Sequence, residues 1–134
     1  MSECIFCKIL KGELPCHKVY EDDKVLAFLD IHPATRGHTL VVWKEHKTCI
    51  EELNEEDFLE FTKKLYNIAK KIGKYSEGYN ILMNDNKAAG QLVPHLHFHI
   101  IPRKEGDGVK VGDWDPLEIQ DIEKIQEDIK KLLK

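Results

Sequence analysis

Residues 95–99 read His-Leu-His-Phe-His, so His95, His97 and His99 alternate between Pro94 and Pro102. Successive side chains of a β-strand point to opposite faces, and a strand here would therefore put three imidazoles on one face. Near neutral pH an imidazole can transfer a proton, attack an electrophile or bind a metal ion. We interpret the run as a chemical site in preference to a half-exposed strand rich in histidine or an ordinary metal cluster.

The sequence begins with a second chemical signal, the Cys4-x-x-Cys7 spacing, which is typical of a metal half-site or a redox pair. Its first residues lack the basic start and apolar stretch of a signal peptide, and no segment has the length of a membrane span. We therefore expect a cytosolic protein. In that reducing compartment, disulfides among Cys4, Cys7, Cys16 and Cys49 are not expected.

Length and charge limit the classes of protein and partner. The chain has 134 residues, of which 42% are hydrophobic and 33% are charged, as in a globular protein. We expect one domain over residues 1–134, with a core that needs no disulfides. The formal net charge of −4 gives no basic surface for nucleic acid or an anionic membrane, so we expect neither partner.

Local patterns predict the elements that hold the histidines. A short amino-terminal helix over residues 5–10 ends before Gly12 and Pro15. The longest helix begins after Asn54, its predicted N-cap, and ends at Gly73. Apolar runs and turn residues predict the strands, which span residues 18–21, 25–29, 39–43, 79–83 and the histidine run itself.

The carboxy-terminal segment predicts one more helix, starting near Asp115, Pro116 and Glu118 and carrying an apolar stripe, as a packed tail or an interface helix. The order of the predicted elements indicates the α+β class: a mainly antiparallel five-stranded sheet with helices on one face. The polar loop over residues 84–90 leads from one strand to the histidine strand, which suggests a hairpin.

Four segments resemble the histidine triad (HIT) family. They are Cys4–Ile9, Leu29–Ile31, Arg36–Val42, and Gly90-Gln91 followed by the alternating histidines. Within the family they are most similar to the Hint branch of nucleoside phosphoramidate hydrolases and nucleotidyl transferases. The resemblance covers residues 4–103, leaving 104–134 as an extension, and it implies a HIT-like fold and a homodimer.

The resemblance assigns catalytic roles to three histidines. His97 matches the residue that attacks the α-phosphorus to form a nucleotidyl-histidine, which water then hydrolyses. His99 matches a histidine that contacts the phosphate, and His38 matches one that assists from a neighbouring strand. Imidazole N–H groups can stabilise charge on the phosphoryl oxygens there.

The resemblance also implies a nucleotide site. Asn84 and the backbone around Gly90, Gln91 and Leu92 match the phosphate-binding segment, although the Hint branch commonly has a hydroxyl residue where Leu92 stands. Asp30 matches the carboxylate that accepts hydrogen bonds from the ribose. An apolar slot for the base corresponds to five residues, each of which, taken singly, is better explained as plain core, namely Phe6, Ile9, Phe28, Ile31 and Leu40.

Some members with this opening sequence carry zinc, and the matching positions here are Cys4, Cys7, His46 and His95. A Cys₂His₂ set suits structural zinc and leaves no open position for catalysis. The resemblance therefore implies that the metal braces the fold while His97 does the chemistry. No organic cofactor is expected.

The resemblance therefore implies a hydrolase that cleaves the P–N bond of purine nucleoside phosphoramidates, or acts on acyl-nucleotides, at the α-phosphate and releases AMP or GMP. Two alternatives stay open: a dinucleoside polyphosphate hydrolase, and a nucleotide-binding or zinc-stabilised scaffold protein with incidental activity.

Overall fold

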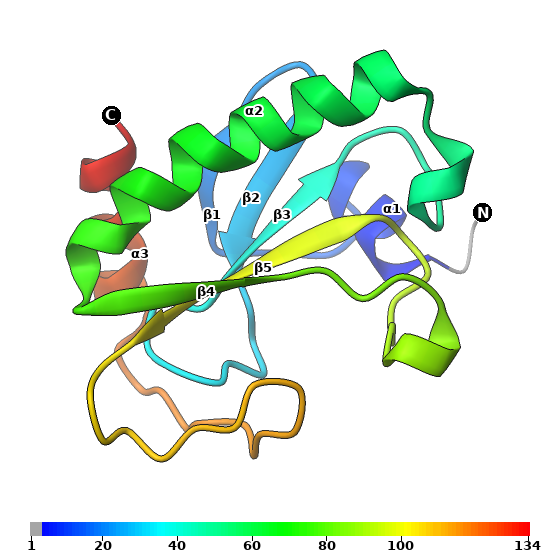
Figure 1. Ribbon diagram of the computed structural model, residues 1–134. Helices are drawn as coiled ribbons and strands as arrows, with labels where there is room; N and C mark the ends of the chain where they lie inside the picture. The colour runs from blue at the N-terminus through cyan, green and yellow to red at the C-terminus, as the bar shows by residue number, and fades with distance from the viewer. Residues whose placement is uncertain (1–3) are drawn as a thin grey trace.

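The computed structural model describes residues 4–134; residues 1–3, which enter the signal-peptide expectation, lie outside the described residues. The helices and strands follow the order α1 (Ile5–Leu10), β1 (Lys18–Glu21), β2 (Val25–Leu29), β3 (Thr39–Trp43), α2 (Glu55–Ile72), β4 (Gly78–Leu82), β5 (His97–Arg103) and α3 (Ile122–Leu133). The α+β class is confirmed (Figure 1). No helix within residues 4–134 is both long and apolar enough to cross a membrane.

The five strands form one antiparallel sheet in the order β1-β2-β3-β5-β4. In the register of β3 with β5, Val42 lies opposite His97 and Leu40 lies opposite His99. Residues that face each other across an antiparallel pair point to the same side. The two histidines therefore share their face with apolar side chains of β3. The predicted pairing of β4 with the histidine strand is confirmed.

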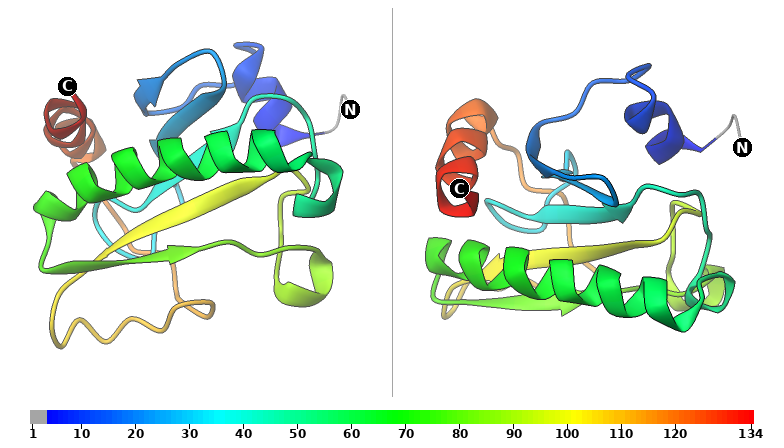
Figure 2. Two further views of the ribbon diagram at one scale, coloured as in Figure 1. Left: turned by 45° about the horizontal axis from the view of Figure 1, so that its top comes forward. Right: turned by 90° about the horizontal axis from the view of Figure 1, so that it is seen from above.

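Both faces of the sheet are covered, but by different helices (Figure 2). Helices α2 and α3 bury the face that carries Phe98 and Ile100. The opposite face packs against α1, where Phe6 meets Phe28 with ring centroids 5.6 Å apart. The expectation of helices on one face was therefore wrong for α1. This placement brings α1 to the face that carries the histidines.

Helix α2 begins and ends as its sequence predicts. The Asn54 side chain accepts a hydrogen bond from the N–H of Asp57 at 2.8 Å, which caps the first turn. The helix ends at Ile72 with Gly73 as its C-cap, and Lys70 and Lys71 lie in the last turn. The long helix is thereby fixed across the sheet.

The structure corrects two predicted boundaries. Strand β5 starts at His97, so His95 precedes the strand, and Pro102 lies inside it instead of ending it. Proline is tolerated there because Ile100 is the last β5 residue paired with β3, so position 102 is paired on one side only. Helix α3 begins at Ile122, several residues later than predicted. The apolar stripe of α3 packs into the core, so this segment is a packed tail and not an interface helix.

Candidate active site

Three imidazoles lie in a row at the α1 face of the sheet. The ring centroids of His97 and His99 on β5 are 5.0 Å apart, and those of His99 and His38, which precedes β3, are 5.2 Å apart. Burial lowers the pKa of His38 and of His99 to about 3, and it also lowers the pKa of His97. The row is therefore uncharged at neutral pH.

Hydrogen bonds determine which nitrogen of each ring carries the proton. His97 Nδ1 lies 2.6 Å from the main-chain oxygen of His95, and because a carbonyl only accepts, Nδ1 must donate. The lone pair of neutral His97 is then on Nε2. A neutral imidazole with a free Nε2 is a nucleophile.

The same reasoning gives the opposite tautomer at the other end of the row. The N–H of Ala34 donates to His38 Nδ1 at 2.9 Å, so the proton of His38 is on Nε2. That Nε2 lies 2.9 Å from His99 Nδ1 and donates to it. His99 therefore carries its proton on Nε2, where it is available as a donor. The row thus pairs a nucleophile with a hydrogen-bond donor.

Asp30, His38 and His99 lie close enough for a metal ion, but their hydrogen bonds oppose one. If His38 bound a metal through Nε2, its proton would move to Nδ1 and face the N–H of Ala34. We therefore do not assign a metal to this cluster, whose hydrogen bonds instead determine where His38 and His99 carry their protons.

A pocket of about 630 Å³ opens in front of the histidine row. It brings together every residue predicted to bind nucleotide, a set spread over α1, β2 and the segment after it, β3, the 84–92 loop and β5. These are Phe6, Ile9, Phe28, Asp30, Ile31, Leu40, Asn84, Gly90, Gln91, Leu92, His97 and His99. His38 is not part of the pocket lining and supports His99 from behind.

The loop at one side of the pocket is held by the Gln91 side chain. Its amide donates to the main-chain oxygens of Thr48 and Val93 and accepts from the N–H of Asn86. These bonds use the polar atoms of Gln91, so its role here is to hold the loop. The neighbouring Leu92 is 93% exposed at the pocket edge.

Sequence reasoning missed one wall of the pocket, which comes from the extension. Trp114 donates its Nε1–H to the main-chain oxygen of His32 at 3.2 Å. Its ring lies 5.3 Å from that of His38 and 6.1 Å from that of His99. A tryptophan in a Gly-rich, acidic connection is the one signal that could have indicated it.

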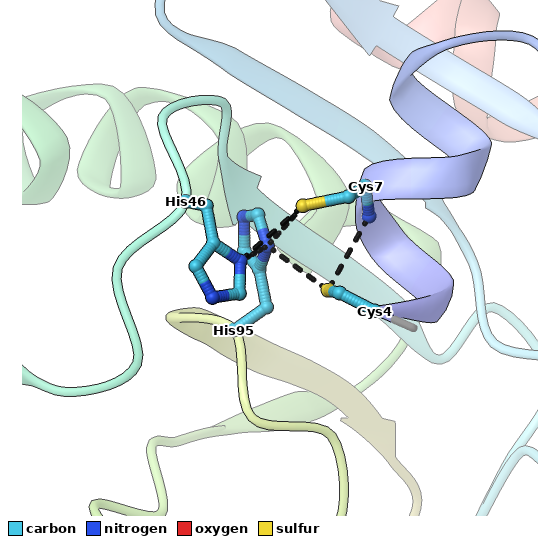
Figure 3. A group of neighbouring side chains, drawn as sticks. All are labelled: Cys4, Cys7, His46 and His95. Atoms are coloured by element: carbon cyan, nitrogen blue, oxygen red, sulfur yellow. Dashed lines mark hydrogen bonds between the residues drawn. The ribbon is translucent and has the colours of Figure 1, made fainter. Parts of the chain in front are cut away.

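A second cluster joins Cys4, Cys7, His46 and His95, the last of which directly precedes strand β5 (Figure 3). Cys4 Sγ is 3.4 Å from His95 Nδ1, Cys7 Sγ is 3.2 Å from His46 Nδ1, and the two Nδ1 atoms are 3.2 Å apart. Tetrahedral zinc with such ligands separates them by roughly 3.3–3.8 Å. The spacing and the soft donors therefore fit zinc.

The ring of His95 is oriented toward this cluster by the backbone. Its Nε2 donates to the main-chain oxygen of Trp43 at 2.6 Å, which leaves the lone pair of Nδ1 facing the two cysteines. Metal-binding histidines usually make such a bond with their other nitrogen. Burial lowers the pKa of His95 to about 4, so the ring is neutral, as a ligand must be.

Comparison with known proteins identifies the family. Residues 11–106 match the family described as the HIT domain. The chain belongs to the HIT family. This HIT protein is 42% identical to an adenosine 5′-monophosphoramidase of Schizosaccharomyces pombe, over 98% of both chains. It is 44% identical to an adenylylsulfatase of Arabidopsis thaliana, over 79% of this chain and 55% of that protein.

A solved structure agrees with the fold. A Zn-bound histidine triad family protein from Mycobacterium smegmatis superimposes on this HIT protein with a TM-score of 0.85. The two are 36% identical, and the alignment covers 98% of this chain and 94% of that one. The predicted HIT-like fold is confirmed.

Proposed function

We propose that this HIT protein hydrolyses purine nucleoside phosphoramidates or acyl-nucleotides at the α-phosphate and releases a nucleoside monophosphate such as AMP or GMP. The observation that carries the proposal is the tautomer of His97. Its Nδ1–H is held by the His95 carbonyl, and its Nε2 lone pair is free in a pocket of nucleotide size. The monophosphoramidase and adenylylsulfatase relatives support the same class of reaction.

The reaction proceeds in two displacements. His97 Nε2 forms a bond to the α-phosphorus while the P–N bond to the leaving amine breaks, and the amine takes up a proton from solvent as it departs. The Nε2–H of His99 donates to a phosphoryl oxygen and stabilises the charge that grows there. Water then attacks the phosphorus and returns a proton to solvent while the bond between phosphorus and His97 Nε2 breaks, which releases the nucleoside monophosphate and restores neutral His97.

The nucleoside end of the substrate occupies the apolar part of the pocket. Phe6, Phe28 and Leu40 form one buried cluster that presents ring and aliphatic surface to a base. Asp30 keeps acceptor capacity for the ribose hydroxyls beside this slot. A slot that stacks a base without reading its edges favours the larger purines.

The charge of the pocket favours a single phosphate. Within residues 4–134, neither lysine nor arginine lines it, and its charged side chains are Asp30 and Asp113. Polyphosphate recognition relies on cations such as Lys, Arg or Mg²⁺ to balance several charges. The dinucleoside polyphosphate alternative is therefore the weaker one. Leu92 offers the leaving group an apolar contact and no hydroxyl.

Zinc, when bound, would be held by Cys4, Cys7, His46 and His95, and it would brace the fold without an open position for substrate. Cys4 is the N-cap of α1 and Cys7 lies on that helix, whereas His46 lies on the loop after β3 and His95 on the segment before β5. The metal would therefore connect three parts of the chain that are distant in sequence. No catalytic step passes through it.

We infer that the whole chain acts as one domain and as a homodimer in the cytosol, without nucleic-acid or membrane partners. Among residues 4–134, strand β4 lies at the edge of the sheet with no strand on its outer side. Tyr79 and Ile81 of this strand are exposed, as is Tyr66 of α2. An open edge with apolar side chains suits a second copy of the chain.

The test measures AMP released from adenosine 5′-phosphoramidate by the wild type and by His97→Ala. Turnover by the wild type that is lost in a folded His97→Ala protein supports the proposal. A diadenosine polyphosphate is assayed in parallel, and faster release from it would favour the alternative hydrolase. Nucleotide binding without turnover of either substrate would favour the scaffold interpretation.

A further inference from the structure

The peptide unit between His95 and Leu96 connects the Cys/His cluster with the nucleophile. Its carbonyl accepts from His97 Nδ1 at 2.6 Å, the bond that determines the tautomer of His97. Its N–H donates to the main-chain oxygen of Lys47 at 2.7 Å. Lys47 follows the cluster residue His46. One rigid peptide plane is thus anchored beside two members of the cluster and holds the reactive ring.

The neighbouring backbone restricts this plane further. The carbonyl of Leu96 accepts from the N–H of Trp43 at 3.2 Å, and the carbonyl of Trp43 accepts from His95 Nε2 at 2.6 Å. His95 precedes strand β5, so its position does not come from regular strand pairing. It comes from these bonds and from the contacts of its ring with the cluster.

A second connection runs through Phe6, which lies between Cys4 and Cys7 in the sequence. Its ring packs edge-on against His97 with centroids 5.0 Å apart and against His95 at 5.9 Å. Phe6 is 5% exposed, so its ring has little freedom to move. Because α1 has only six residues, tertiary contacts must hold it, and the cluster adds to the packing of Phe6 in attaching the start of this helix.

We propose that metal held by Cys4, Cys7, His46 and His95 positions the nucleophile, with His95 and Phe6 as positioning residues that keep His97 in its Nδ1–H tautomer and orientation. The metal then affects the chemical step without touching substrate. The activity part of this inference rests on the proposed function, whereas the tautomer part does not. A metal that only stabilised the fold would leave His97 unchanged in any folded form.

The first test is ¹⁵N NMR of the histidine rings in protein loaded with Zn²⁺ and in protein stripped by a chelator. Nitrogen shifts distinguish the two neutral tautomers of His97. We expect the loaded form to show the Nδ1–H tautomer alone and the stripped form to show a mixture, with zinc restoring the first state. A folded, stripped protein that keeps the single tautomer overturns the proposal.

Cys7→Ser provides a second test, since it leaves three of the four ligands. Cys49→Ser is the matched control because Cys49 is also a free, partly buried thiol but lies outside the cluster and the pocket. We expect Cys7→Ser to give the tautomer mixture and Cys49→Ser to match the wild type. Unfolding of both the stripped protein and Cys7→Ser would assign the cluster to fold stability alone and overturn the proposal.

Kinetics separate the two proposals. On adenosine 5′-phosphoramidate, we expect stripping or Cys7→Ser to lower kcat about 10- to 100-fold, the range for loss of groups that orient a ligand or catalytic group. We expect KM to change little because the same side chains still line the nucleoside slot. A fall in kcat matched by an equal rise in KM would indicate that the whole pocket has loosened and would contradict a specific role in positioning His97. Absence of turnover in the loaded wild type contradicts the proposed function, while the NMR result still decides the positioning role.

Discussion

Identical side chains acquire different chemistry here from single hydrogen bonds. His97 and His99 are two residues apart on one strand, yet the proton lies on Nδ1 in the first and on Nε2 in the second. The difference comes from what each Nδ1 meets, a carbonyl that only accepts or an imidazole N–H that donates. Spacing in the sequence shows that the rings share a face, but it does not determine their tautomers.

His38→Ala tests this assignment. Loss of the His38 Nε2–H frees His99 to adopt either tautomer, so its donation toward the phosphate becomes intermittent. We expect kcat for the phosphoramidate to fall about 10- to 100-fold, somewhat less than removal of a direct donor costs. Steady-state kinetics measure this, with His17→Ala as the control because His17 does not line the pocket. Wild-type kcat in a folded His38→Ala protein would show that His99 needs no support.

Apolar residues that alternate predicted most of the strands well, and apolar residues three or four positions apart predicted most of the helices well. Helix α2 matches because Asn54 and Gly73 mark its ends locally. Helix α3 starts late because Asp121 forms a bidentate ion pair with Arg36, a contact across the fold that no local pattern contains. Strand β5 passes through Pro102 because the missing partner on one side depends on the register of β3.

The site was predicted unevenly for the same reason. The nucleotide and metal residues are brought together as expected, but that expectation came from a family resemblance and not from spacing. Trp114 was missed because its place depends on tertiary contacts, including the hydrogen bond from Leu117 N–H to the oxygen of Pro33. Residues in an irregular segment have no periodicity to reveal the side they face.

Trp114→Ala tests the wall that the extension adds to the pocket. Removal of the indole exposes the side of the site beside His38 and His99, so we expect a several-fold lower kcat/KM and easier entry of water. Trp114→Phe keeps an aromatic wall and loses only the Nε1–H bond to His32, and we expect it to retain most activity. Competition assays with AMP measure affinity. Equal kinetics for wild type and Trp114→Ala would exclude this wall from the site.

Asp22 ties the turn between β1 and β2 to helix α2. Its carboxylate accepts from the N–H groups of Lys24 and Val25, from the Tyr20 hydroxyl and from Lys64 Nζ. Burial by itself would raise the pKa of this group, but these hydrogen bonds outweigh burial and lower its pKa to about 2. The ionised carboxylate is therefore stabilised in the folded state.

The sign of the pH effect follows from this lowered pKa. The contribution of Asp22 is complete above the ordinary aspartate pKa of 3.8 and is lost as pH falls through about 2. We expect Asp22→Asn to lose about 1–3 kcal/mol of unfolding free energy at neutral pH. The difference from wild type should shrink between pH 3.8 and 2 in urea titrations. A difference independent of pH would contradict the ion-pair explanation.

For the whole molecule, the distribution of charge matters more than its sum. The net charge is −4, and two of the carboxylates, Asp30 and Asp113, line the pocket together with the neutral imidazoles of His97 and His99. A substrate with one phosphate negative charge meets hydrogen-bond donors there, whereas a longer polyphosphate would meet uncompensated repulsion. Selection of the leaving group is therefore a property of the whole pocket and not of one side chain.

The position of β4 at the edge of the sheet makes the proposed homodimer testable. Ile81 on that strand is 47% exposed, so a charge there interferes with a partner strand more than with the monomer fold. We expect wild type to sediment as a dimer at micromolar concentration and Ile81→Lys to shift toward monomer. Leu14→Lys is the control, because Leu14 is similarly exposed at 39% but lies in the loop after α1. A monomeric wild type would contradict the homodimer. A dimer that Ile81→Lys leaves unaffected would contradict a subunit contact through β4.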